Sequence, residues 1–249
     1  MNSYRRKYIF SLDFTDLEMP YLHRDQMEVA VKDDLVLYYW PGACSLAAHI
    51  VLEEIALPFN AVKVDFSAGK QQTPEYLAIN PHGRVPALQT SWGVLTENPA
   101  VLRYLGGIAA NQPHAPDLWP ADLKIEARCG EWCSWLASTV HVTYAHISRA
   151  ERYADTLDGR AEVARKGVEA CRPLWEEIED RLHGLQWALG EHYSVLDAYL
   201  QVFWNWGRGT RLKYDMKREF PAWTAHALRL AERPATQRAF AREGLPLPE

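Results

Sequence analysis

The residues with the clearest capacity for chemistry are Cys44 and Ser45, which lie at a turn between two apolar runs. Residues 35–39 form an apolar, aromatic run of strand length, Pro41-Gly42 interrupts it, and apolar residues then recur at helical spacing up to Ile55. The start of a helix offers unpaired backbone N–H groups and a partial positive charge, which stabilise an anion. This position therefore predicts a thiol whose pKa lies below the free value of about 8.5. An inert, buried cysteine fits the same position equally well.

Length and charge limit the classes of function. At 249 residues the chain is long enough for two domains, and a 48% apolar fraction supplies ample material for their cores. The net charge of −5 and the absence of long charged blocks argue against nucleic acid or an anionic membrane as the main partner. No segment approaches the ~20 apolar residues that a membrane helix needs. We therefore expect a small-molecule partner.

The four cysteines, Cys44, Cys129, Cys133 and Cys171, lack the spacing of a disulfide framework or a zinc knuckle. This pattern predicts reduced thiols and a cytoplasmic location. Cys129 and Cys133 lie one helical turn apart, a spacing that suits either two metal ligands or simple packing. We favour packing and expect no metal site.

Hydrophobic periodicity and the positions of prolines predict how the chain is divided into segments. Residues 1–33 show no sustained period and are expected to be a poorly ordered extension, unless the true start is Met27. Strands are predicted at 35–39, 59–65, 85–89 and 94–96, and helices at 45–55, 73–80 and 98–109, so that residues 34–110 form a small α/β unit in the order βαβαββα. Three prolines at 111–120 predict a linker. Residues 121–249 are expected to be all-helical, with helices at 122–149, 160–182, 194–206, 221–233 and 235–242.

Within the helical part, Ser194 and Asp197 have the spacing of a capping box. In such a box the side chains of the first and fourth residues each accept a hydrogen bond from the other's backbone N–H. We therefore interpret Asp197 as a structural residue rather than a catalytic one.

Several motifs, taken in order, resemble those of glutathione transferases, and most closely the bacterial beta class. They are Tyr39-Trp-Pro41-Gly-Ala-Cys44-Ser45, Asn80-Pro-His-Gly83-Arg84-Val85-Pro86-Ala-Leu88, Thr96-Glu97-Asn98-Pro99-Ala, the box from Ser194 to Asp197, and Glu232-Arg-Pro234. The resemblance covers about residues 35–244. It implies a thioredoxin-like α/β domain followed by an all-α domain, glutathione as co-substrate, and a homodimer.

The resemblance also implies a glutathione-binding set: Lys70, Arg84, Val85, Pro86, Glu97 and Asn98. A cis bond before Pro86 would expose the Val85 backbone, which would pair with the cysteinyl part of glutathione like an added strand. Glu97 and Asn98 would hold the ammonium and carboxylate of the γ-glutamyl group at a helix N-terminus. Lys70 and Arg84 are the candidates for the glycyl carboxylate.

For the sulfur of glutathione, the implied partners are Cys44, Ser45, Tyr39 and His141. The beta class commonly has a lysine after this histidine, whereas this chain has Val142, so one positive charge is expected to be missing. The second substrate would occupy an apolar cleft, for which the candidate walls are Trp40, Tyr144, Ile147, Trp206 and Leu212.

Three functions fit these residues. The first is a glutathione transferase in which the glutathione thiolate attacks a small hydrophobic electrophile. The second keeps the fold but makes Cys44 the reactive group, in thiol-disulfide exchange or reductive cleavage, because a second cysteine is absent from the position that it occupies in thioredoxins. The third is a non-catalytic binding protein.

Overall fold

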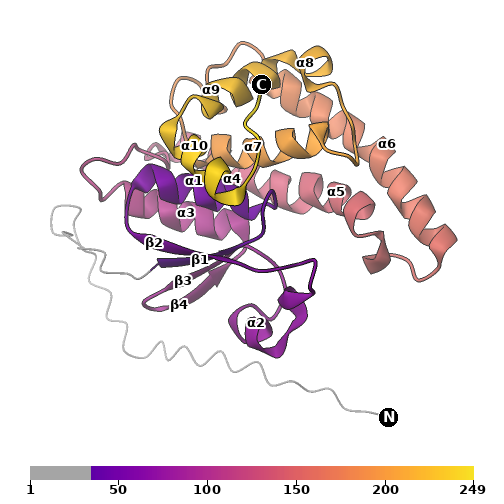
Figure 1. The fold of residues 1–249 in the computed structure, drawn as a ribbon. Coiled ribbons are helices and arrows are strands. Elements are labelled where there is room, and N and C mark those ends of the chain that lie inside the picture. The colour runs from indigo at the N-terminus through magenta and orange to yellow at the C-terminus, as the bar shows by residue number, and fades with distance from the viewer. Residues whose placement is uncertain (1–34) are drawn as a thin grey trace. The chain divides into compact units, whose positions relative to one another are not determined.

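A computed structural model of the protein describes residues 35–249, so the predicted extension at 1–33 lies outside the described residues. Four strands, β1 (Leu35–Tyr39), β2 (Phe59–Lys63), β3 (Ala87–Thr90) and β4 (Gly93–Thr96), form one sheet in the order β2-β1-β3-β4. β1 pairs parallel to β2 and antiparallel to β3, and β3 pairs antiparallel to β4 (Figure 1). Alternate residues of β1 are buried, as expected for a strand with helices packed on the sheet.

Helices cover both faces of this sheet. α1 (Ser45–Ile55) and α3 (Asn98–Ala109) lie on one face, and η3 (Lys70–Gln72) and α2 (Pro74–Ile79) lie on the other (Figure 1). The predicted N-cap of α2 is present, because the Thr73 side chain accepts a hydrogen bond from the backbone N–H of Tyr76 and Pro74 follows it. The predicted βαβαββα order is confirmed.

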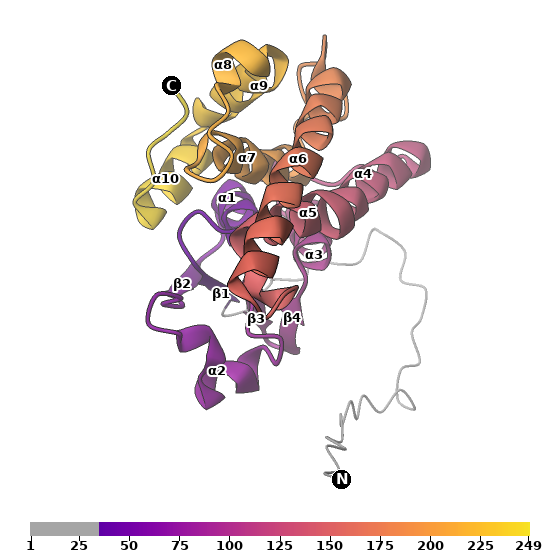
Figure 2. The ribbon, with the colours of Figure 1, turned by 90° about the vertical axis from the view of Figure 1, so that its right-hand side faces the viewer.

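The rest of the described chain is helical (Figure 2). Its elements are α4 (Leu123–Trp135), the π-helical turn η4 (Leu136–Val140), α5 (His141–Ser148), η5 (Ala150–Arg152), α6 (Leu157–Leu182), α7 (Val195–Arg208), α8 (Met216–Glu219), α9 (Pro221–Ala231) and α10 (Pro234–Glu243). The single helix predicted at 122–149 is divided by the π turn, and α8 was not predicted from the sequence. No helix within residues 35–249 is both long and apolar enough to cross a membrane.

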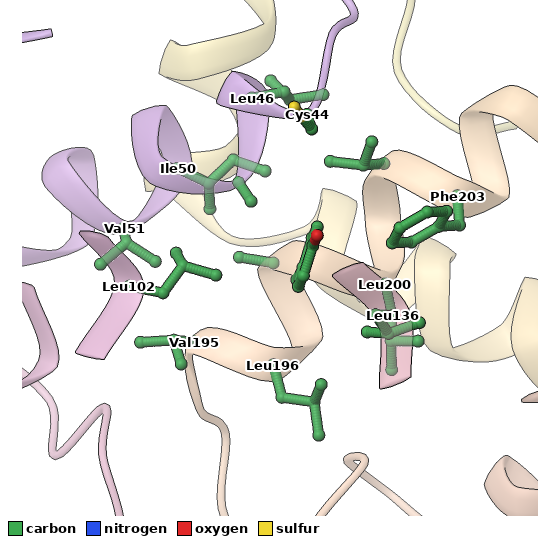
Figure 3. Packing of buried hydrophobic residues seen from close by; sticks show 14 of the residues in the cluster. Cys44, Leu46, Ile50, Val51, Leu102, Leu136, Val195, Leu196, Leu200 and Phe203 are labelled. Carbon is green, nitrogen blue, oxygen red and sulfur yellow. The ribbon is translucent and has the colours of Figure 1, made fainter. Parts of the chain in front are cut away.

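One hydrophobic core joins the α/β and helical parts. α1 packs against α3, α7 and α10. Leu46, Ile50 and Val195 are among the side chains in the cluster (Figure 3). The predicted division into domains at 34–110 and 121–249 stays a prediction, although residues 111–122 contain no helix or strand. Cys129 and Cys133 are both buried in this core.

A buried polar cluster anchors α7. The capping box of Ser194 and Asp197 is present, and the Asp197 carboxylate also accepts hydrogen bonds from the backbone N–H of Ala188 at 2.8 Å and from Nε2 of His226 at 2.7 Å. Asp197 is fully buried. The structural interpretation of Asp197 is therefore confirmed.

The C-terminal helix is tied to the turn that precedes α1. The buried carboxylate of Glu243 accepts a hydrogen bond from the Gly42 N–H at 2.9 Å and contacts Nδ1 of His49 at 2.8 Å. Gly42 has φ of +69°, a conformation that favours glycine. α10 thus helps to hold the turn that carries Cys44.

Candidate functional site

Two adjoining cavities lie between the N-termini of α1 and α3 on one side and η4 and α5 on the other. The smaller has a volume of about 150 Å³ and the larger of about 590 Å³. They share a wall, because the lining of both includes Cys44, Arg84, Val85, His141, Ala145 and Arg152. The site is therefore composed of residues from both parts of the fold.

Cys44 is the N-cap of α1, and its thiol donates a hydrogen bond to the Val85 carbonyl oxygen at 3.2 Å. The expectation of a lowered pKa is wrong for the unliganded protein. Burial raises the pKa of the Cys44 thiol to about 12, and the backbone N–H groups of Cys44 and Ser45 offset only part of that shift. Desolvation outweighs the helix terminus here, so the thiol is protonated at neutral pH.

The turn before β3 presents an unpaired backbone group. The Val85–Pro86 peptide bond is cis, as the resemblance implied. Within residues 35–249 the Val85 N–H has no hydrogen-bond acceptor, while its carbonyl accepts from Cys44 and has a second lone pair. Both residues line the smaller cavity, so the Val85 backbone is positioned to bond an extended ligand.

The start of α3 forms the opposite wall of the smaller cavity. Glu97 is the N-cap of α3 with φ of +67°, and Asn98 is its first residue. The Asn98 Nδ2 donates a hydrogen bond to the Cys44 carbonyl oxygen at 3.1 Å, which ties the two helix N-termini together. Its Oδ1 is buried without a donor, and such an atom is costly unless a ligand or water satisfies it. Both residues line the cavity, and their role in binding a γ-glutamyl group stays a prediction.

His141 lines both cavities from the first position of α5. The π turn that precedes it changes which residues face the cleft, and such turns are frequent at functional sites. Burial lowers the pKa of His141 to about 4, and the positive charges of Arg84 and Arg152 contribute. The imidazole is therefore neutral at neutral pH.

Three of the predicted residues do not reach either cavity. Ser45 is fully buried, and its hydroxyl bonds the backbone of Trp40 instead, with an N···O distance of 3.3 Å. Tyr39 packs edge-on against His49, with ring centroids 5.2 Å apart. Lys70 is exposed in η3, whereas the other candidate for the glycyl carboxylate, Arg84, lines both cavities.

Aromatic residues form one wall of the larger cavity, as predicted for Trp40, Tyr144 and Trp206. The rings of Tyr144 and Trp206 are stacked with centroids 4.4 Å apart. The Trp206 Nε1 donates a hydrogen bond to the Gly42 carbonyl oxygen at 2.9 Å, which links α7 to the turn before α1. The wall is thus fixed by both parts of the fold.

The other two predicted wall residues point elsewhere. Residues of α5 that line the cavities, such as His141, Tyr144 and Ser148, share one helical face. Ile147 is on another face and lies against Gly167 of α6. Leu212 is buried in the core, whereas the preceding Arg211 lines the cavity.

Sequence reasoning missed three arginines of the larger cavity: Arg149, Arg152 and Arg211. Arg149 is the last residue of the helix predicted at 122–149 and Arg152 follows it by three residues, and this spacing was the only available signal. Arg152 also restores a positive charge near His141, where Val142 had indicated that one was missing.

Comparison with known proteins identifies the family to which the chain belongs. Residues 33–107 match the family model described as the glutathione S-transferase N-terminal domain. The chain is 32% identical over 214 residues to the glutathione S-transferase GstA of Escherichia coli O157:H7, a match that covers 84% of this chain and 98% of the relative.

Two solved structures are also similar. A glutathione transferase homologue from Sulfitobacter with bound glutathione has 35% identity and a TM-score of 0.76, and the match covers 85% of this chain and 99% of that one. A bacterial beta class glutathione S-transferase from Sphingomonas chungbukensis has 31% identity and a TM-score of 0.70, and the match covers 85% of this chain and 100% of that one. The chain therefore belongs to the glutathione S-transferase family. The predicted resemblance to the bacterial beta class is confirmed.

Proposed function

We propose that this protein is a glutathione transferase that conjugates glutathione to small electrophiles. One observation carries the proposal: two helix N-termini and the unpaired Val85 N–H meet at a single cavity, where the buried Oδ1 of Asn98 also lacks a partner. The N–H groups of the α3 terminus suit a carboxylate at one end of a peptide, and the Asn98 Oδ1 suits a donor such as the ammonium group beside that carboxylate. The Val85 N–H suits a peptide backbone to pair in the middle.

Each part of glutathione has a complementary group in the site. The Val85 backbone pairs with the cysteinyl residue, which places the sulfur beside Cys44. The N–H groups at the N-terminus of α3 take the γ-glutamyl carboxylate, and Glu97 and the Asn98 Oδ1 take the ammonium group. Arg84 takes the glycyl carboxylate, because it lines both cavities whereas Lys70 lines neither.

Bound glutathione supplies a thiolate that attacks the electrophilic carbon, so that an S–C bond forms, the leaving group departs with its bonding pair, and the thiol proton goes to solvent. The protein's part is to stabilise the negative charge on that sulfur. With a pKa of about 12 the Cys44 thiol keeps its proton. It donates a hydrogen bond to the glutathione sulfur by turning its S–H away from the Val85 carbonyl oxygen, which accepts it in the unliganded protein. Neutral His141 and the N-terminus of α1 act on the same sulfur.

Thiol-disulfide exchange is the weaker alternative. It requires Cys44 itself to be a thiolate. The burial of Cys44 and the hydrogen bond from its thiol to Val85 both oppose ionisation.

Cys44→Ser separates the alternatives. The variant keeps a hydroxyl donor, so conjugation of chlorodinitrobenzene is expected to fall by less than about tenfold. If Cys44 is the reactive group, reduction of a mixed disulfide of glutathione is the dominant wild-type activity and disappears in this variant, which would contradict the proposal. Calorimetry that detects glutathione binding without turnover of either substrate would favour a non-catalytic binding protein.

A further inference from the structure

The larger cavity has an unusual charge. Among the described residues its lining includes Arg84, Arg149, Arg152 and Arg211 and no aspartate or glutamate. The four arginines come from three separate segments: the turn before β3, the corner between α5 and α6, and the loop after α7. The cavity therefore concentrates positive charge in a chain whose net charge is −5.

These guanidinium groups lack carboxylate partners. Within residues 35–249, none of the four forms an ion pair. Arginines elsewhere commonly do: Arg172 pairs with Glu176, and Arg233 with Glu54. The cavity arginines are thus available to an external anion.

The same groups are close enough to repel one another. Burial lowers the pKa of Arg152, and the neighbouring Arg84 and Arg149 lower it further, against a smaller opposing effect of Glu151. Like charges held together in a partly desolvated cleft are unfavourable, and a bound anion relieves that repulsion.

Glutathione leaves most of this charge unmatched. Of its two carboxylates, one is assigned above to the N-terminus of α3 and the other to Arg84. No negative group of glutathione remains for Arg149, Arg152 or Arg211. The second substrate is the ligand that can supply an anion to them.

The remaining walls indicate what else that substrate contains. Tyr144 and Trp206 form a stacked pair, and Trp40 stacks with Phe66 at a centroid distance of 5.7 Å. Flat apolar walls of this kind favour an aromatic ring. Guanidinium groups favour a carboxylate, which they bind with two parallel hydrogen bonds.

We infer that the larger cavity selects aromatic electrophiles that carry a carboxylate, with the ring against Tyr144 and Trp206 and the carboxylate on Arg149, Arg152 and Arg211. This inference rests on the proposed function and adds the class of its second substrate. When the substrate is an aryl chloride, the glutathione sulfur bonds to the ring carbon and chloride leaves that carbon with the bonding pair. The carboxylate is unchanged.

Binding without turnover tests the inference first. The probes are meta-nitrobenzoate and its uncharged amide, neither of which has a leaving group at an activated carbon, and the measurement is calorimetric titration of the full chain. The wild-type protein is expected to bind the benzoate at least about tenfold more tightly than the amide, the value of one charge-assisted hydrogen bond. Equal affinities, or tighter binding of the amide, would overturn the inference.

The double variant Arg149→Gln/Arg211→Gln is expected to lose that preference. The matched control is the double variant Arg128→Gln/Arg165→Gln, at exposed residues that pair with Glu131 and Glu162 and lie outside the cavity. An equal loss in the control would mean that only the overall charge of the protein matters, and the inference would fail. The wild-type preference must also shrink as salt is added, which gives a readout that does not depend on the folding of a variant.

A kinetic comparison then distinguishes this inference from the proposed function. The substrates are para-chloro-meta-nitrobenzoate and its amide, each rate being normalised to the uncatalysed reaction with glutathione. Preferred turnover of the benzoate supports both proposals. Turnover without that preference overturns the inference alone, and no turnover of either substrate, together with no calorimetric binding of glutathione, overturns the proposed function.

Discussion

The two halves of the site recognise their ligands by different means. The α/β half contributes mainly backbone groups and caps: the Val85 N–H, the N-terminus of α1 at Cys44, and Asn98 at the start of α3. The helical half contributes side chains, among them His141 and Trp206. Backbone groups are positioned by turns and helix ends and suit one constant ligand, whereas side chains on a cleft can differ without a change of fold. The difference assigns glutathione to the first half and the choice of electrophile to the second.

The halves are nevertheless mechanically connected. Glu243 of α10 and Trp206 of α7 both hydrogen-bond the backbone of Gly42, in the turn that carries Cys44. A displacement of either helix would move this turn. The comparison can therefore be sharpened by variants that disturb one half at a time.

The largest effect is expected from Asp197→Ala, which disrupts the support of the helical half. The change removes the acceptor for Ser194 N–H, Ala188 N–H and His226 Nε2, all in a buried region. We expect the free energy of unfolding in urea to fall by about 3–5 kcal/mol. Asp215→Ala, which removes an exposed cap of α8, is the control and should cost about 1 kcal/mol. Similar losses in the two variants would contradict the role given to the buried cluster.

Asn98→Leu tests the α/β half. The variant keeps most of the side-chain volume but removes the amide that faces the smaller cavity and bonds the Cys44 carbonyl. Glutathione affinity measured by calorimetry should fall about ten- to hundredfold, since hydrogen bonds to a charged group are lost. Asn111→Leu, at an exposed residue outside both cavities, should leave it unchanged. Unchanged affinity in Asn98→Leu would remove α3 from the glutathione site.

The smallest effect is a pH dependence carried by His141. Its pKa is about 4 in the folded protein against 6.5 ordinarily, so between these values the unfolded chain binds more protons. Stability is therefore lost as pH falls from 6.5 towards 4. Urea unfolding at both ends of this window should show a loss that is smaller by about 1–2 kcal/mol in His141→Gln than in the wild type. An identical loss in both proteins would mean that His141 is accessible to protons in the folded state.

What the sequence predicted follows the same division. The motif around Cys44, the turn at Val85 and the helix start at Asn98 are local features, and local rules of capping and turn formation place them correctly. The sequence does not reveal which way neighbouring side chains point, so it predicts sulfur contacts for Ser45 and Tyr39, which line neither cavity. It also did not reveal how burial and the helix terminus balance at the Cys44 thiol, because burial is a property of the folded chain.

The helical half was harder to predict for a physical reason. Hydrophobic periodicity indicates one helix over 122–149. A π turn within it alters the direction in which His141 points, and the pattern of apolar residues does not reveal this turn. Arg149 and Arg211 come from distant segments, and only the packing of α5 against α6 and α7 brings them to one cavity. Residues that meet only through tertiary structure have no regular spacing in the sequence that could reveal their contact.

The central claim is that this site ionises the sulfur of glutathione and leaves Cys44 protonated. An ultraviolet titration of thiolate absorbance, with glutathione bound to the wild type and to Cys44→Ser, tests it most directly. The account predicts a thiolate that forms below the free-thiol pKa of about 8.5 and persists in Cys44→Ser, because the ionised sulfur belongs to glutathione. A signal that vanishes in Cys44→Ser, or a bound thiol that titrates like free glutathione, would contradict it.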